Sequence, residues 1–167
     1  MILHPLTNEE RATFGATHRA IITYADLVSV GGANNTATIA LFTTPNNSDG
    51  TYTANKEINL VNSLLVTPFT GTDGTLVSTA VTVGDGGNNA RLLASQELNL
   101  AGATVYAKGG ALASNAPNVP ATSTATNAYF TATAGKALNT LTAGEIHFFL
   151  DYIVGPAAQN VGVGSIN

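Results

Sequence analysis

Two neighbouring stretches decide the class of fold: Ser63-Leu-Leu-Val-Thr-Pro-Phe-Thr-Gly-Thr-Asp73 and Ala80-Val-Thr-Val-Gly-Asp-Gly-Gly-Asn-Asn-Ala-Arg-Leu-Leu-Ala-Ser95. The first is an apolar run that leads into a loop with proline and glycine. The second alternates Val and Thr before a Gly-Asp-Gly-Gly turn. A period of two places successive side chains on opposite faces of a strand. The two stretches therefore predict consecutive β-strands joined by loops.

Similar segments, rich in Ile, Val, Thr and aromatic residues, lie on both sides of this region. Clusters of Gly, Asn, Pro and Ser separate them at Gly31 to Asn35, which we interpret as the long loop of a hairpin, and at Thr44 to Gly50. Further strands are expected over Ala20 to Val30, Thr36 to Thr43, Glu57 to Thr67, Leu76 to Val83, Ala103 to Ala107, Ala128 to Ala134 and Ala137 to Leu141.

The clearest strand is the last, Glu145 to Val154, which follows an expected turn at Thr142 to Gly144. Its alternation predicts one apolar core face, made of Ile146, Phe148, Leu150, Tyr152 and Val154. The opposite face carries Glu145, His147, Phe149 and Asp151. An aromatic ring among these polar groups indicates cover by a loop or another subunit, and an ordinary surface aromatic is the alternative.

The N-terminal segment carries the signature of one short helix. Thr7 and Glu10 have the spacing of a capping box, and Gly15 can end the helix, so we expect it over about residues 8 to 14. The segment 1–19 is interpreted as an arm that either reaches a neighbouring subunit or folds on its own sheet.

These patterns together predict an all-β fold: a two-sheet β-sandwich of jelly-roll type with about eight strands, one short N-terminal helix and flexible termini. The sandwich domain is expected over residues 20–155, followed by a flexible, glycine-rich tail over 156–167. The low-complexity stretch Gly109 to Thr126 is expected to be a long exposed loop.

Composition restricts the function. Only 10% of the 167 residues are charged, against about 25% in ordinary soluble domains, so Thr, Asn, Ser, Gly and Ala must form much of the surface. Such a surface suits a protein that other subunits cover, although a secreted β-domain would share it. The net charge is −4 and the six basic residues are scattered, which argues against nucleic-acid binding. Neither a signal peptide nor a membrane-spanning segment is predicted.

Residues with chemical potential are present but do not form a catalytic set. The three histidines, His4, His18 and His147, lie in separate segments without a nucleophile motif. Glu145 and Asp151 share a strand face but stand about 20 Å apart along an extended chain, too far to flank one bond. Glu9 and Glu10 are interpreted as acids of the helix start. We therefore predict no catalytic residue and no enzyme activity.

The turn Gly84 to Arg91 resembles a calcium site, because Asp85, Asn88 and Asn89 offer oxygen ligands. One carboxylate supplies little charge to hold the ion. The favoured interpretation is that Asp85 closes its own turn and Arg91 braces it. No metal-binding or cofactor-binding residue is predicted, and no cofactor.

Several segments in this order resemble a broad group of small structural proteins of tailed bacteriophages: Tyr24 to Leu27, Thr38 to Thr43, Leu65 to Gly71, Val81 to Gly86, Ala90 to Leu93 and Gly144 to Tyr152. Among these proteins the chain is most similar to capsid cement or decoration proteins. The resemblance implies a homo-oligomer, with a trimer favoured, that is made in the host cytoplasm. It would bind the major capsid protein on the outside of the virion, without turnover.

Two alternative functions stay open at this point. A receptor-binding or carbohydrate-binding module of a tail or head fibre could use exposed aromatic residues, with Tyr52, Tyr106 and Tyr129 as candidates. The second alternative function is that of a head–tail connector component. Position and copy number in the particle would distinguish them.

Overall fold

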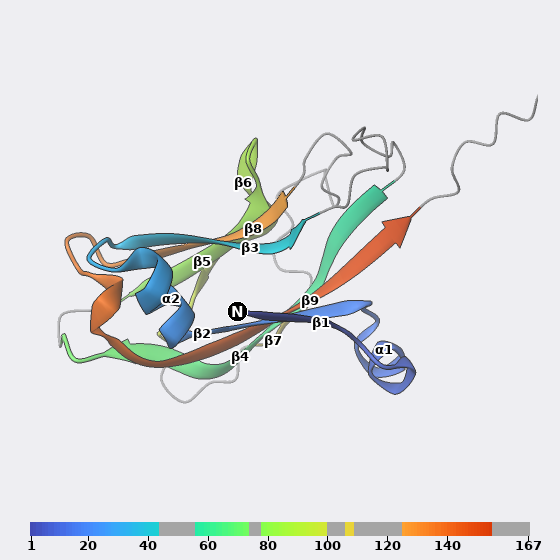
Figure 1. Ribbon diagram of the computed structural model, residues 1–167, viewed down its shortest axis with the longest axis horizontal. Helices are drawn as coiled ribbons and strands as arrows, with labels where there is room; N and C mark the ends of the chain where they lie inside the picture. The colour runs from blue at the N-terminus through green and yellow to red at the C-terminus, as the bar shows by residue number, and fades with distance from the viewer. Residues whose placement is uncertain (44–55, 74–77, 100–105, 109–124, 155–167) are drawn as a thin grey trace, which may run out of the picture.

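The computed structural model describes residues 1–43, 56–73, 78–99, 106–108 and 125–154 (Figure 1). The strands are β1 (Ile2–Pro5), β2 (His18–Thr23), β3 (Thr36–Thr43), β4 (Lys56–Gly71), β5 (Thr79–Asp85), β6 (Asn88–Glu97), β7 (Tyr106–Lys108), β8 (Ala125–Ala132) and β9 (Leu141–Val154). The helices are α1 (Asn8–Phe14), α2 (Tyr24–Gly31) and the 3₁₀ helix η1 (Leu138–Thr140). None of these helices has the length and hydropathy needed to cross a membrane.

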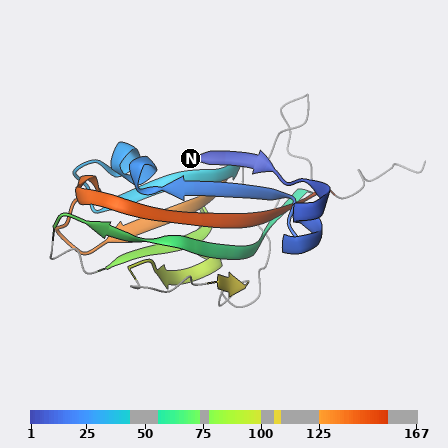
Figure 2. The same ribbon diagram turned by 90° about the horizontal axis from the view of Figure 1, so that it is seen from below.

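The strands form two antiparallel sheets stacked face to face (Figures 1 and 2). One sheet has the order β1-β2-β9-β4-β7 and the other β3-β8-β5-β6. Early and late strands interleave in both, because β9 lies between β2 and β4, and β8 lies between β3 and β5. With β1 set aside, eight strands arranged in this way form a jelly roll. The predicted two-sheet β-sandwich is confirmed.

The core lies between the two sheets. Ile146, Phe148 and Leu150 of β9 are fully buried there, as the alternation predicted. Phe69 of β4 meets Phe130 of β8 across the core, with ring centroids 6.2 Å apart. Nothing is described of the Tyr152 and Val154 side chains, which the sequence assigned to the same face.

The predicted N-terminal helix is confirmed as α1, with both arms of the capping box present. The Glu10 backbone N–H donates to Thr7 Oγ1 at 3.2 Å, and the Thr7 N–H donates to Glu10 Oε2 at 2.9 Å. Gly15 ends the helix at φ 66°. Of the two possibilities for the N-terminal segment, the structure shows the second, because β1 pairs with β2 of its own sheet.

The strand predicted over Ala20 to Val30 is wrong in its second half, where the chain forms α2. The Asp26 carboxylate accepts hydrogen bonds from the backbone N–H and the hydroxyl of Thr23, at 2.8 and 2.9 Å, and so caps the first turn. Leu27 is completely buried, so packing and the cap override the strand preference of this segment. The hairpin over Gly31 to Asn35 is also wrong, since β2 and β3 belong to different sheets.

The segment before the last strand differs as well. Residues expected as a strand over Ala137 to Leu141 instead include η1, and β9 begins at Leu141, so the expected turn at Thr142 to Gly144 is part of the strand. The sequence also missed β6, which begins directly after the turn at Gly86 and Gly87. The strand β3 is confirmed over its full length, whereas β4, β5 and β8 occur with shifted ends.

Some expectations fall outside the described residues. These are most of the expected loop Gly109 to Thr126, the tail over 156–167 and the start of the strand expected at Ala103. β7 occupies Tyr106 to Lys108, which overlaps the end of that expected strand.

Gly144 is required where β9 passes over the core. Its φ is 144°, and a Cβ at this position would lie 2.3 Å from the Phe69 ring. We expect Gly144→Ala to lower the free energy of unfolding by about 2 kcal/mol or more, because the Cβ would overpack against Phe69 and the backbone would be strained at this φ. Urea unfolding of the variant against wild type measures this loss. Gly86→Ala is the matched control, since its Cβ would meet nothing within 4 Å; equal stability of the two variants would contradict the prediction.

Candidate functional site

The candidate site is the outer face of the five-stranded sheet, and α1 covers one end of it. Phe149 of β9 points outward and is only 1% exposed. The Phe14 ring of α1 stacks on it at 4.4 Å, and Leu6 and Ala16 complete a second small apolar cluster. The cover that the sequence predicted for Phe149 is therefore supplied by the chain's own N-terminal helix.

Beyond α1, an outward-facing row of mainly apolar side chains crosses the sheet. Register places Ile2 of β1 opposite Ile21 of β2, Ile21 opposite His147 of β9, and His147 opposite Leu64 of β4. We call these four residues the apolar row. Ile2 is 62% exposed, whereas Leu64 packs partly against the cluster under α1.

The row ends at the edge strand β1. Its side away from β2 has no partner in the described sheet, and Met1, Ile2 and Leu3 are all exposed there. The amino group of Met1 forms an ion pair with Asp26, which ties the start of β1 to the first turn of α2. An edge strand with apolar side chains can pair with another chain.

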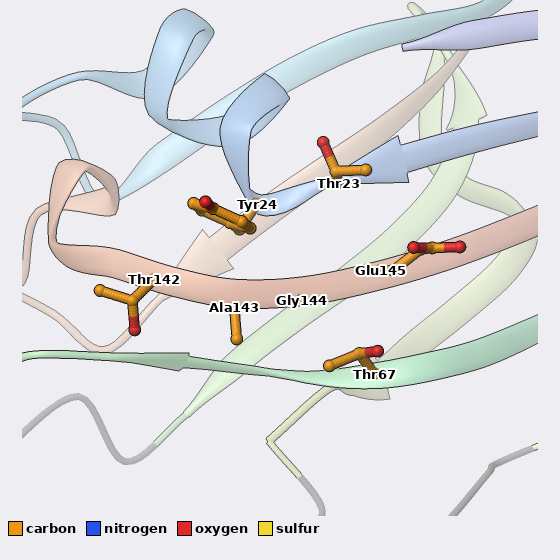
Figure 3. A pocket seen from close by; sticks show the side chains of 7 residues that line it. All are labelled: Thr23, Tyr24, Thr67, Thr142, Ala143, Gly144 and Glu145. Carbon is orange, nitrogen blue, oxygen red and sulfur yellow. The ribbon is translucent and has the colours of Figure 1, made fainter.

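A pocket of about 230 Å³ opens on the same sheet where β2 passes into α2 (Figure 3). It is lined by Thr23, Tyr24, Thr67, Thr142, Ala143, Gly144 and Glu145. Tyr24 is 37% exposed. Glu145 Oε1 lies 2.7 Å from His147 Nε2, so the pocket borders the apolar row. Sequence reasoning missed Tyr24 because it placed this residue inside a strand.

The Gly84 to Arg91 turn has the structure that the sequence favoured. Asp85 Oδ1 accepts hydrogen bonds from the backbone N–H groups of Gly87 and Asn88, both at 2.8 Å, and Arg91 Nε donates to Oδ2 at 2.6 Å. Burial raises the pKa of Asp85, but the hydrogen bonds from Arg91 and the backbone outweigh it, so the pKa lies below its usual value. Both carboxylate oxygens are thus engaged within the turn.

The structure does not bring the other titratable candidates together into one site. His4 receives a hydrogen bond from Arg19 Nε at 3.3 Å, while the His18 ring meets the edge of Phe42. His147 pairs with Glu145. Within the described ranges, no three His, Asp or Glu side chains gather closely enough to hold a metal ion.

The three tyrosines named as carbohydrate candidates do not form one site among the described residues. The Tyr129 hydroxyl donates to the Asp85 carbonyl at 3.0 Å and so serves the fold. Tyr106 lies opposite Leu64 in the β4–β7 register, and only its backbone is described. Tyr52 lies outside the described residues.

No protein-family model matches the chain, and no curated protein matches it. Among solved structures, a chain of the "Cyanophage Pam1 capsid asymmetric unit" is similar at 14% identity and a TM-score of 0.49, over 82% of each chain.

Asp85→Asn is expected to lower the free energy of unfolding at pH 7 by about 1–3 kcal/mol, because it weakens a buried, charge-assisted hydrogen bond to Arg91. A carboxylate with a depressed pKa stabilises the fold above its unfolded pKa, and this contribution disappears as the pH falls through the folded pKa. The stability difference between the variant and wild type should therefore be full above about pH 4, the unfolded pKa of Asp, and should narrow as the pH falls below it.

Denaturant unfolding between pH 3 and 7 measures this narrowing. The matched control is Glu9→Gln, which alters an exposed acid of α1 and should change stability little. A constant difference between Asp85→Asn and wild type over the whole range would contradict the assigned role.

Proposed function

We propose that this protein is a structural protein of a tailed-phage virion that binds the outer capsid shell as a cement or decoration protein. The partner is the major capsid protein, the protein acts as a homo-oligomer with a trimer favoured, and no turnover is involved. The partner class comes from the resemblance of the ordered sequence segments. The observation that supports a binding role is the partial exposure of the apolar row and of the adjoining edge strand β1.

The apolar row has the properties that a protein partner needs. Its side chains come from neighbouring strands of one sheet, so they form a fixed, preorganised surface. Ile2, at the open end, exposes most of its side chain to water, and covering it in a complex is favourable. The free edge of β1 adds backbone groups that can pair with an extended segment.

The low charge of the chain fits this role. Few charges have to lose water when such a surface is covered. A protein that binds only the assembled shell stabilises it by mass action, and a trimer would multiply modest contacts through effective concentration. Both effects would resist the outward pressure of packaged DNA.

The direct test mixes purified protein with phage heads that lack decoration. We expect co-sedimentation and a higher temperature of head disruption. Absence of both effects would contradict the proposal. Binding at a single vertex in electron micrographs would favour a connector instead.

Ile2→Ser should weaken head binding about tenfold, because an exposed Ile buried in the complex contributes about 1.5–3 kcal/mol. Val30→Ser is the matched control: Val30 is 56% exposed on α2 and lies outside the apolar row. Equal binding of the two variants would exclude the row as the docking surface.

A further inference from the structure

We propose that the pocket at the junction of β2 and α2 binds one neutral sugar ring. This inference goes beyond capsid attachment and does not depend on it. The site is built from β2, β4, β9 and the start of α2. None of its lining residues is a carbohydrate candidate from the sequence alone.

The first argument is that the lining of the pocket is rich in hydroxyl-bearing residues. Thr23 at the end of β2, Thr67 of β4 and Thr142 of β9 all line the pocket, together with Tyr24 (Figure 3). Thr23 Oγ1 donates to Asp26 at 2.9 Å, so its lone pairs can accept from a ligand. The Thr23 hydroxyl can therefore only accept, and beside it hydroxyls that can donate or accept match the alternating donors and acceptors of a sugar ring.

The second argument is the aromatic ring of Tyr24. It is partly exposed and stands beside the small residues Ala143 and Gly144, so the wall of the pocket is apolar at this point. A sugar ring presents a C–H face as well as its hydroxyls. A tyrosine combines an apolar body with a polar tip and can contact both.

The charge of the pocket favours a neutral sugar over anionic and cationic small ligands. Glu145 is the single charged residue of the lining, and its carboxylate repels anions. A cationic ligand would have to share this carboxylate with His147, whose Nε2 lies 2.7 Å from Oε1. The second oxygen, Oε2, can accept a hydrogen bond from a ligand hydroxyl, as carboxylates do from neutral donors.

Size limits the ligand to one ring. The pocket volume is about 230 Å³, below the roughly 300 Å³ at which sites for drug-sized molecules begin. An oligosaccharide would therefore place one residue in the pocket and extend across the outer face of the sheet.

The test is a titration of the full chain, without capsids, followed by backbone NMR. The ligands are glucose, galactose, mannose, rhamnose and N-acetylglucosamine, with glucuronate as the anionic and glucosamine as the cationic comparison. Concentrations up to about 20 mM are needed, because small, shallow sites bind weakly. We expect at least one neutral sugar to shift amide signals of Thr23, Tyr24, Thr67 and residues 142–145, and glucuronate to shift none.

Two pairs of variants assign the site. Tyr24→Leu should weaken binding about tenfold, whereas Tyr24→Phe keeps the ring and should stay within about threefold of wild type. Glu145→Gln should weaken binding, and Glu9→Gln, an exposed acid on α1, should not. Unchanged denaturant midpoints would show that the variants fold.

Three results would overturn the proposal. They are no shift with any neutral sugar, shifts that lie outside the pocket, and stronger binding of glucosamine than of every neutral sugar. Loss of head binding in Ile2→Ser with normal sugar binding would leave this inference intact, so the two proposals fail separately.

Discussion

The structure depends on the antiparallel pairing of β9 with β2 on one side and β4 on the other. This pairing places the last described strand at the centre of one sheet, between the early strand β2 and β4. Because side chains alternate along β9, its inner face supplies Ile146, Phe148 and Leu150 to the core. Its outer face presents Glu145 and His147 to the candidate site. One strand therefore supports both the fold and the proposed binding surface.

Two carboxylates of this chain serve the fold, the half-buried Glu97 and the buried Asp85. Glu97 Oε1 accepts hydrogen bonds from the backbone N–H groups of Thr79, Leu98 and Asn99, at 2.9 to 3.1 Å, and Oε2 accepts from the Ser78 hydroxyl at 2.6 Å. Burial raises the pKa of Glu97, but these hydrogen bonds outweigh it and hold the pKa below its usual value. Asp85 closes the β5–β6 turn in the same way. The outer face of β9 carries Glu145 and His147, which pair with each other beside the apolar residues of the row.

The two proposed activities share this face without competing for the same atoms. The apolar row leads toward the free edge of β1, while the pocket opens beside α2, and only the Glu145–His147 pair joins them. If the apolar row docks on the shell and the pocket beside α2 lies outside the contact, the pocket can still bind a sugar. A rigid sheet suits both roles, because neither a docking surface nor a shallow pocket then has to be ordered on binding.

The sequence by itself determined features that depend on a few neighbouring residues: the capping box of Thr7 and Glu10, the inward and outward alternation along β9, and the Asp85 turn braced by Arg91. Each follows from local geometry, so spacing alone predicts it. The tertiary structure decided the helix at Tyr24, the cover of Phe149 by Phe14, and the meeting of Thr23, Thr67 and Glu145 around one pocket. The last two features require contacts between distant segments, whereas at α2 a local cap, Thr23 with Asp26, combines with the burial of Leu27 to outweigh the strand preference of the segment.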